Sequence, residues 1–315
     1  MAHTMSAGRW ADVAEIGTMQ ALRFGARLHR MVGRRFGLLL IWPAVLYFFL
    51  RDGRARRASR RYLEQLTTSP AGRAALGGEP NARAVLRHMH EFAVSLYDRF
   101  SIWSGALENM HVEHDGSGRI FELVRSGRGA LLLGAHLGNI DMLWFLSKKY
   151  ALVVNVVVFF GNAERINAFF ESLSPDAKVR AIDIDPTSVR AAFEIRSCIQ
   201  RGEFVVILAD RAAPGKTARN AEAPFLGRSA RFPLTPFQMA GVLDCPVLLT
   251  LCVRRGNARY ETILRPLAPA QRVPRSEQEQ RARALLERYA ALLESTCLEH
   301  PLQWFNFYDF WENDA

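Results

Sequence analysis

The sequence has 315 residues, of which 49% are hydrophobic and 23% are charged. These fractions are ordinary for a packed globular protein, so they exclude a disordered or fibrous chain. The four cysteines form no C-x-x-C pair, which excludes a zinc ribbon and a thioredoxin-type motif. We expect all four to be buried thiols in a protein that faces a reducing compartment.

The net charge of +10 is concentrated near the N-terminus. Residues 1–61 contain twelve arginines and three acidic residues, and so carry nine of the ten net positive charges. A segment of this kind suits a polyanion, which is either nucleic acid or an anionic membrane surface.

An uncharged apolar run lies inside this basic segment. Residues 36–50 read FGLLLIWPAVLYFFL and have a pair of arginines on each side. As a helix the run reaches about 22 Å, which is short of the ~30 Å hydrocarbon core, and Pro43 predicts a kink in it. The run favours insertion into one leaflet with the arginines on headgroups, and a buried core helix is the alternative. Nucleic acid is disfavoured as a partner, because apolar residues gain nothing from phosphates.

The predicted elements change in character along the chain. Helical spacing predicts helices over residues 10–35, 54–66 and 81–105, with a loop rich in Gly, Ala and Pro over residues 69–80. From about residue 119, short β-rich runs alternate with helical stretches. The predicted strands are residues 130–135, 152–160, 179–184, 204–209 and 247–253.

This alternation predicts an α/β fold with a mostly parallel central sheet flanked by helices. Thr187 is a predicted helix cap, and Ser276-x-x-Glu279 predicts a capping box that opens a last long helix. We expect residues 1–70 to form N-terminal membrane-associating helices and residues 71–315 to form the α/β domain.

Several catalytic motifs are missing from the sequence. It contains no P-loop, no G-x-G-x-x-G, no G-x-S-x-G and no H-E-x-x-H. The histidines at 88, 90, 111 and 114 lack a metal-ligand spacing, so we expect no metal site. Asp183-Ile184-Asp185 is a D-x-D pattern at the end of a predicted strand, as in metal-dependent glycosyltransferases, although Pro186 gives it a plain turn explanation.

The strongest local pattern surrounds His136, in Gly134-Ala135-His136-Leu137-Gly138-Asn139-Ile140-Asp141. An apolar strand delivers His136 to its carboxyl end, where open α/β sheets bind ligands. Gly138 permits a tight bend, which would let the carboxylate of Asp141 accept from one imidazole N–H and leave the other nitrogen as a base. A partly buried histidine beside an N-terminal helix acid is the alternative.

The His136-x4-Asp141 pattern resembles the first motif of the glycerolipid and lysophospholipid acyltransferase superfamily, and the chain is most similar to the branch that contains the late acyltransferases of bacterial lipid A. Three later blocks resemble that branch in the same order, from near residue 202 to near residue 307. They are Gly202-Glu203-Phe204 through Ala209-Asp210-Arg211, then Phe225-Leu226-Gly227, and Pro301-x-Gln303-Trp304-Phe305-Asn306-Phe307. The end of the chain also resembles a subgroup of predicted acyltransferases often found with aryl-polyene-type lipid pathways.

The resemblance implies a glycerol-3-phosphate acyltransferase-like fold and a catalytic pair of His136 and Asp141, although the lipid A branch usually has Glu in place of this Asp. It implies substrate contacts near both predicted strand ends and in the later blocks. The implied contact residues are Gly138, Asn139, Arg165 (with Arg180 as a rival), Asp210, Arg211, Phe225, Leu226 and Gly227. Leu143, Trp144 and Phe225 are candidates to line an acyl tunnel, and an ion pair of Asp210 with Arg211 is the structural alternative for those two.

The implied reaction moves a fatty acyl group from a thioester, on acyl carrier protein rather than coenzyme A, to a hydroxyl or amine of a lipid or glycolipid. It needs no cofactor and no metal. The implied location is the cytoplasmic face of a bacterial inner membrane, with an anionic membrane surface and acyl carrier protein as partners and no nucleic acid. The alternatives are a glycosyltransferase that uses Asp183 and Asp185 with a divalent ion, and a non-catalytic membrane-binding module.

Overall fold

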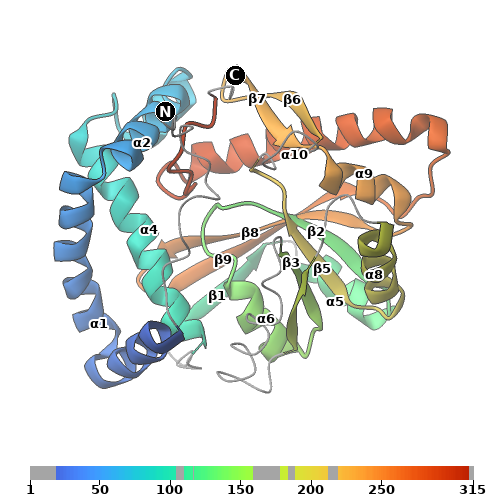
Figure 1. Ribbon diagram of the computed structural model, residues 1–315, viewed down its shortest axis with the longest axis horizontal. Coiled ribbons are helices and arrows are strands. Elements are labelled where there is room, and N and C mark those ends of the chain that lie inside the picture. Colours follow the sequence, from blue (N-terminus) through green and yellow to red (C-terminus); the bar gives the residue numbers. More distant parts are fainter. Residues whose placement is uncertain are drawn as a thin grey trace, which may run out of the picture.

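The computed structural model describes residues 19–103, 110–115, 117–158, 178–183, 189–211 and 219–311. A seven-stranded sheet forms its centre, with strand order β1-β9-β8-β2-β5-β3-β4 (Figure 1). All neighbouring strands are parallel except β8 and β9, which form an antiparallel pair. The strands are β1 (His111–Asp115), β2 (Ala130–Gly134), β3 (Val154–Val158), β4 (Val179–Asp183), β5 (Phe204–Leu208), β8 (Val247–Gly256) and β9 (Arg259–Ala268). The predicted α/β fold with a mostly parallel sheet is confirmed.

Helices cover both faces of the sheet, and side chains that alternate along the strands decide which face each helix covers. On β2, Leu131 and Leu133 pack in the core on one face, while Leu132 packs in the core on the other. The first face is covered by α8 (Val189–Gln200), α9 (Thr235–Val242) and α10 (Gln278–Glu299). The second face is covered by α5 (Ser117–Arg125) and α6 (Met142–Tyr150).

The N-terminal helices stand at one side of the sheet (Figure 1). The predicted helix over 10–35 and the apolar run over 36–50 form one helix, α1 (Met19–Arg51), within the described residues. It is followed by α2 (Gly53–Leu66) and α4 (Ala82–Trp103), which the spacing predicts closely. Ile41 and Val45 of α1 and Leu63 of α2 are buried in the same core as the first face of the sheet. The division of the chain at residue 70 stays a prediction.

The predicted loop over residues 69–80 is wrong in part, because it contains the short helix α3 (Pro70–Leu76). Ser69 caps this helix by accepting a hydrogen bond from the backbone N–H of Gly72 at 3.0 Å, and Pro70 occupies its first turn. Gly77 ends it in a left-handed conformation, with φ of 82°. The same residue types that suggest a loop therefore cap a helix here.

The predicted capping box at Ser276 and Glu279 is also wrong. Residues Arg275–Glu277 form a 3-10 turn, and α10 begins after it at Gln278 without a side-chain cap. The predicted cap at Thr187 lies outside the described residues. A hairpin that the sequence reading did not predict, β6 (Asn220–Phe225) and β7 (Arg228–Pro233), lies beside α10 (Figure 1).

The apolar residues of α1 between positions 36 and 50 face outward for the most part. Leu39, Phe48 and Leu50 are 63%, 57% and 65% exposed, while Ile41 and Val45 are buried. No single helix among the described residues has the length and apolar composition of a membrane span, whereas Phe36–Arg51 and Gly53–Leu66 have them as a pair bent by 93°. The alternative of a wholly buried core helix over residues 36–50 is therefore wrong.

Candidate active site

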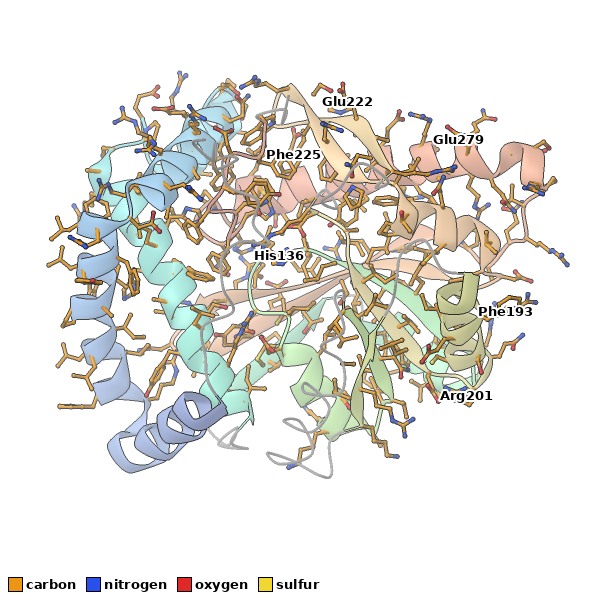
Figure 2. All side chains as sticks on the ribbon, viewed as in Figure 1. His136, Phe193, Arg201, Glu222, Phe225 and Glu279 are labelled. Carbon is orange, nitrogen blue, oxygen red and sulfur yellow. The ribbon has the colours of Figure 1, made fainter. Side chains whose placement is uncertain are left out.

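His136 stands beside Asp210 because their strands are neighbours in register. Strands β2 and β5 pair in parallel with Gly134 opposite Leu208. The backbone N–H of Ala209 continues the ladder by donating to the carbonyl of Gly134 at 3.0 Å. His136 (labelled in Figure 2) and Asp210 each lie two residues beyond that pair in register, and so at the same edge of the sheet.

The carboxylate of Asp210 is fully buried and accepts three hydrogen bonds. The imidazole Nδ1 of His136 is 2.8 Å from its Oδ1, and the backbone N–H of His136 donates to its Oδ2 at 2.9 Å. The indole Nε1–H of Trp304 donates to the same Oδ2 at 3.0 Å. Burial alone would raise the pKa of Asp210, but His136 holds that pKa below its usual value. The buried carboxyl is therefore ionised and can only accept hydrogen bonds.

The protonation of His136 follows from this partner. Burial lowers the pKa of His136 below 6.5, and the charges of Arg211 and Arg99 lower it further, against the opposing effect of Asp210. The ring is neutral at pH 7, and its one proton lies on Nδ1 because the carboxylate can only accept. Nε2 then carries a lone pair, as a general base requires. The side chain of His136 is 28% exposed, so the ring is within reach of a substrate.

No hydrogen bond or ion pair joins Asp141 to His136 among the described residues, and the catalytic role expected of Asp141 stays a prediction. Backbone bridges join Leu137 to Trp304 and Gly138 to Cys252, and they carry the chain away from the imidazole. Asp141 lies at the start of α6, where its Oδ2 is 2.6 Å from Nε of Arg99 on α4. The acid five residues along the chain therefore pairs with a neighbouring helix, and an acid 74 residues away takes the predicted position.

Gly138 and Asn139 build the turn between these two sites. Gly138 has φ of 72°, and a Cβ at this position would collide with the carbonyl oxygen of Cys252. Asn139 is buried, and its side-chain oxygen accepts from the backbone N–H of Asp141 at 3.1 Å while its amide donates to the carbonyl of Ser95 at 3.2 Å. A contact of either residue with substrate stays a prediction.

The segment after α10 is bonded to the loop that holds His136. The backbone N–H of Phe305 donates to the carbonyl of His136 at 2.8 Å, and that of Gly138 donates to the carbonyl of Gln303 at 2.8 Å. Arg211 donates from Nη2 to the carbonyl of Phe305 at 3.0 Å and from Nε to the Asn306 side chain. Asp210 and Arg211 thus bond different groups, while the charge of each still acts on the other. A contact of either residue with substrate stays a prediction.

Of the other predicted contact residues, three lie at the turn between β6 and β7, and Arg165 lies outside the described residues. Phe225 and Leu226 are buried at the turn between β6 and β7, where Gln65 and Glu294 bond the backbone of Leu226. Gly227 follows in the same turn with φ of 79°. Arg165 lies outside the described residues, and Arg180 is an exposed residue of β4.

The remaining candidates are the acyl-tunnel residues, the D-x-D pattern, the cysteines and a metal site. Leu143 is buried in the core between α6 and the sheet, whereas the side chain of Trp144 is outside those described. Asp183 ends β4, and Asp185 lies outside the described residues, so the D-x-D alternative stays untested. All four cysteines are buried and free of disulfides, as predicted. The residues that the structure describes contain no cluster of three or more His, Cys, Asp or Glu side chains placed for a metal ion.

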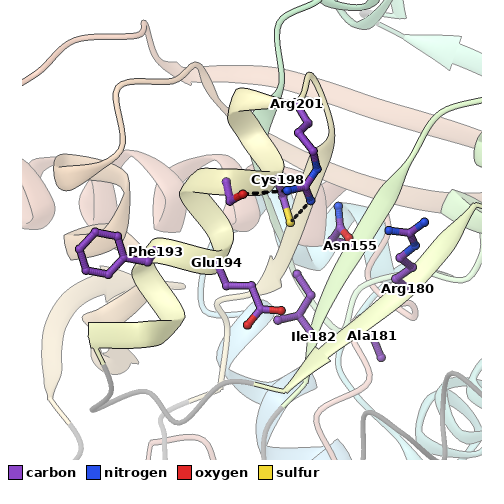
Figure 3. A pocket seen from close by; sticks show the side chains of 9 residues that line it. Asn155, Arg180, Ala181, Ile182, Phe193, Glu194, Cys198 and Arg201 are labelled. Atoms are coloured by element: carbon purple, nitrogen blue, oxygen red, sulfur yellow. Dashed lines mark hydrogen bonds between the residues drawn. The ribbon is translucent and has the colours of Figure 1, made fainter.

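A cavity of about 530 Å³ lies between α8 and strands β3 and β4 (Figure 3). Its lining includes Arg180, Phe193 and Arg201. Figure 2 shows Phe193 and Arg201 well away from His136. Arg201 is paired with Glu203 beside this cavity. The cavity lining includes none of His136, Asp210 and Trp304, so the cavity is separate from the site around His136.

Trp304 is the site residue whose role the sequence reading missed. The motif around it suggests family membership, but nothing in the local sequence predicts a hydrogen bond to an acid 94 residues away. Comparison with known proteins supplies the family: the model of the bacterial lipid A biosynthesis acyltransferases matches residues 86–313, well over half of the chain. A comparison with curated proteins gives no match.

Proposed function

The chain belongs to the bacterial lipid A biosynthesis acyltransferase family, and we propose that it uses His136 as the general base of acyl transfer to a lipid acceptor. The family makes the chain an acyltransferase that acts on a lipid acceptor. The observation that carries the proposed mechanism is the 2.8 Å contact between Nδ1 of His136 and the buried carboxylate of Asp210. That contact fixes the tautomer in which Nε2 accepts a proton.

The reaction follows from this tautomer. Nε2 of His136 takes the proton of the acceptor hydroxyl or amine while the acceptor atom attacks the carbonyl carbon of the acyl thioester. A bond forms between the carbonyl carbon and the acceptor atom, and the π electrons of the C=O bond move to its oxygen, which becomes an oxyanion. When that oxyanion collapses, the carbon–sulfur bond breaks and the thiolate takes the proton from Nε2. The products are the acylated lipid and a free thiol, and no acyl-enzyme is formed.

The surrounding charges support each stage of this cycle. Asp210 stabilises the imidazolium that forms when Nε2 is protonated, and it stays ionised throughout. Arg99 and Arg211 lower the pKa of His136 through their positive charges, so both guanidinium groups act electrostatically at the imidazole. The same charges favour the oxyanion on the thioester carbon. Asp141 acts in this scheme by holding Arg99.

The donor is an acyl thioester on acyl carrier protein rather than coenzyme A, as the resemblance to the lipid A branch implies. Exposed arginines on α2 would favour an acidic carrier as well as an anionic lipid, because both present negative charge. Arg54, Arg57, Arg60 and Arg61 are exposed on this helix. The acceptor is a lipid or glycolipid that offers a hydroxyl or amine.

The enzyme works at the cytoplasmic face of the inner membrane. The exposed apolar side chains of α1 suit the acyl region of one leaflet, and the exposed arginines of α2 suit its anionic headgroups. The 93° bend between the two helices allows one to enter the leaflet while the other lies along it. Membrane lipids are then delivered to the side of the sheet where these helices stand.

The test is an acyl-transfer assay on the purified full chain with vesicles of inner-membrane lipid. Labelled acyl groups are supplied on acyl carrier protein or on coenzyme A, and the labelled lipid products are identified by mass spectrometry. We expect His136→Ala to lower turnover by ~10²–10⁴-fold, since general-base catalysis contributes about that much. His111→Ala, at the exposed start of β1, is the matched control and is expected to leave turnover unchanged. Undiminished transfer by folded His136→Ala protein would rule out the base.

A further inference from the structure

A line of buried hydrogen bonds connects α2 to the carboxylate beside His136. Ser59 of α2 lies with its Oγ 2.8 Å from Nδ1 of His88 on α4. Nε2 of His88 is 2.9 Å from the backbone carbonyl of Trp304, and the indole of Trp304 reaches Asp210. Ser59, His88 and Trp304 are all fully buried. Three segments far apart in the sequence are therefore linked in series to the carboxylate of Asp210.

The direction of each bond is fixed by chemistry. A carbonyl only accepts, so Nε2 of His88 carries the proton that it donates to Trp304. Burial lowers the pKa of His88 to about 4, so the ring is neutral and its Nδ1 accepts from the hydroxyl of Ser59. The indole Nε1–H only donates, and the ionised Asp210 only accepts. Every polar group in this line has its partner, which a buried network needs in order to be rigid.

Trp304 is held at both ends of the residue. His88 fixes its carbonyl, and a bridge with Leu137 fixes its backbone beside the loop of His136. The rings of Tyr62, Phe225 and Phe310 pack edge-on against the indole, with centroids 4.8–5.1 Å away. The indole is therefore packed in one position, with its Nε1–H directed at Asp210.

We propose that Trp304 and His88 are positioning residues for the catalytic base, with Trp304 sharing the charge of Asp210 and His88 fixing Trp304. This inference rests on the proposed role of His136. The indole N–H withdraws part of the negative charge of the carboxylate, so less of it is available to hold a proton on His136. Removing that N–H concentrates the charge toward Nδ1 and makes the imidazole more basic. It also frees the carboxylate to rotate, which loosens the alignment of Nε2 with the acceptor.

The experiment measures the pKa of His136 by NMR titration of histidine-labelled protein without substrate, with the resonance assigned by its loss in His136→Gln. Trp304→Phe keeps an aromatic ring and removes the N–H. We expect the pKa of His136 to rise by about half a unit and the acid limb of kcat/KM to move upward with it. The other charges near the ring, those of Asp210, Arg211 and Arg99, are unchanged in this variant.

Trp311→Phe is the matched control. Trp311 belongs to the same aromatic cluster, with its ring 6.2 Å from that of Trp304, but its buried Nε1 has no hydrogen-bond partner among the described residues. This control is expected to leave the pKa of His136 unchanged. A shift in Trp304→Phe alone supports the proposal. No shift in Trp304→Phe, or an equal shift in both variants, overturns it.

His88 is tested by a second pair of variants, which also serves if Trp304→Phe does not fold. His88→Phe removes the donor to Trp304, and His88→Gln keeps an amide donor on a flexible side chain. We expect a rise of the His136 pKa in His88→Phe and a smaller one in His88→Gln. Equal pKa values in both variants and the wild type overturn the role of His88. Full acyl transfer by His136→Gln would instead overturn the proposed function. The titration is made without substrate and does not depend on that reaction, so the two failures can be told apart.

Discussion

Arg99 on α4 and Asp141 at the start of α6 form an ion pair, with Nε and Oδ2 2.6 Å apart. This pair occupies the acid that the His-x4-Asp pattern assigns to His136. Asp210 is the carboxylate that contacts the imidazole of His136. The ion pair also holds the guanidinium of Arg99, whose positive charge acts on that imidazole. Under the proposed mechanism Asp210 and Asp141 have different roles, and variants of each separate them.

Asp210→Asn is expected to lower turnover far more than Asp141→Asn. An amide at position 210 donates to Nδ1 and moves the ring proton to Nε2, where it blocks the base. We expect a loss of ~10²-fold or more for Asp210→Asn, which approaches that of removing the imidazole. Asp141→Asn keeps the tautomer and only frees Arg99, so a loss of about tenfold is expected. Steady-state acyl transfer on folded proteins measures both, and the reverse ranking would restore Asp141 as the orienting acid.

The pH dependence of kcat/KM reports the ionisation of His136. A general base works unprotonated, and burial holds the pKa of His136 below 6.5. Activity is therefore expected to level off at high pH and to fall as the pH drops through the pKa of His136, which lies below 6.5 in the folded enzyme. Measuring kcat/KM from pH 4.5 to 8, in buffers of constant ionic strength, shows this fall at low pH. An acid limb above pH 7 would contradict this environment for the imidazole.

The stability of the fold is expected to decline between pH 6.5 and pH 4. The pKa of His88 falls from 6.5 to about 4 on folding, because the ring is buried. In that window the unfolded chain binds a proton that the native protein does not, so the free energy of unfolding decreases as the pH falls. Each pKa unit corresponds to about 1.4 kcal/mol. Urea unfolding of wild type and His88→Gln at pH 7 and pH 5 measures this, and the variant is expected to lose less between the two values.

Gly138→Ala is expected to disrupt the loop of His136. The backbone at this position has φ of 72°, and a Cβ would collide with the carbonyl oxygen of Cys252. The left-handed conformation alone costs a non-glycine residue about 1–3 kcal/mol, and the collision adds to it. Gly77→Ala is the control, because φ there is also positive at 82° but nothing stands within 4 Å of the added carbon. Thermal unfolding is expected to show a larger loss for Gly138→Ala, with activity reduced beyond the loss of folded protein.

Binding to anionic vesicles is expected to have a part that salt weakens and a part that salt leaves intact. Replacing Arg54 and Arg57 with Gln reduces the first part, because exposed charges are screened within about 8 Å at physiological ionic strength. Replacing Leu39 and Phe48 with Ser reduces the second part, since burial of apolar area is not screened. Phe193→Ser, equally exposed on α8, is the control and should leave binding unchanged. Cosedimentation at rising salt measures both parts, and equal binding by all variants would exclude α1 and α2 as the contact.

The sequence predicts the inner strands well, for a physical reason. Strands β2 and β5 are buried on both faces, so each is an unbroken apolar run that is visible without knowledge of its neighbours. The edge strand β1 reads HVEHD and has no such run. The β6–β7 hairpin alternates buried and exposed residues over short stretches that include proline, and its pairing depends on packing beside α10.

The site is predictable only as far as it is local. His136 comes just after a buried strand and shortly before Gly138. This local pattern places a titratable group at the edge of the sheet where ligands bind. The identity of its carboxylate depends on strand order, since β5 neighbours β2 although β3 and β4 intervene in the sequence. Trp304 lies 94 residues from Asp210 in the sequence, so its hydrogen bond to that carboxylate is not predictable from local sequence either. The sequence offers Asp141 as the nearest acid, whereas in the fold Asp141 is paired with Arg99.

The dependence of Asp210 on Trp304 sets the order of events during synthesis. A ribosome completes α1, α2 and the whole seven-stranded sheet before it reaches residue 304, so in the nascent chain the carboxylate beside His136 still lacks its indole partner. Docking of residues 301–311 closes contacts that span some 94 to 216 residues of chain, and contacts of that span form late. The hydrogen bond from Trp304 to Asp210 is thus expected to form after the sheet, as one of the last contacts that complete the surroundings of His136.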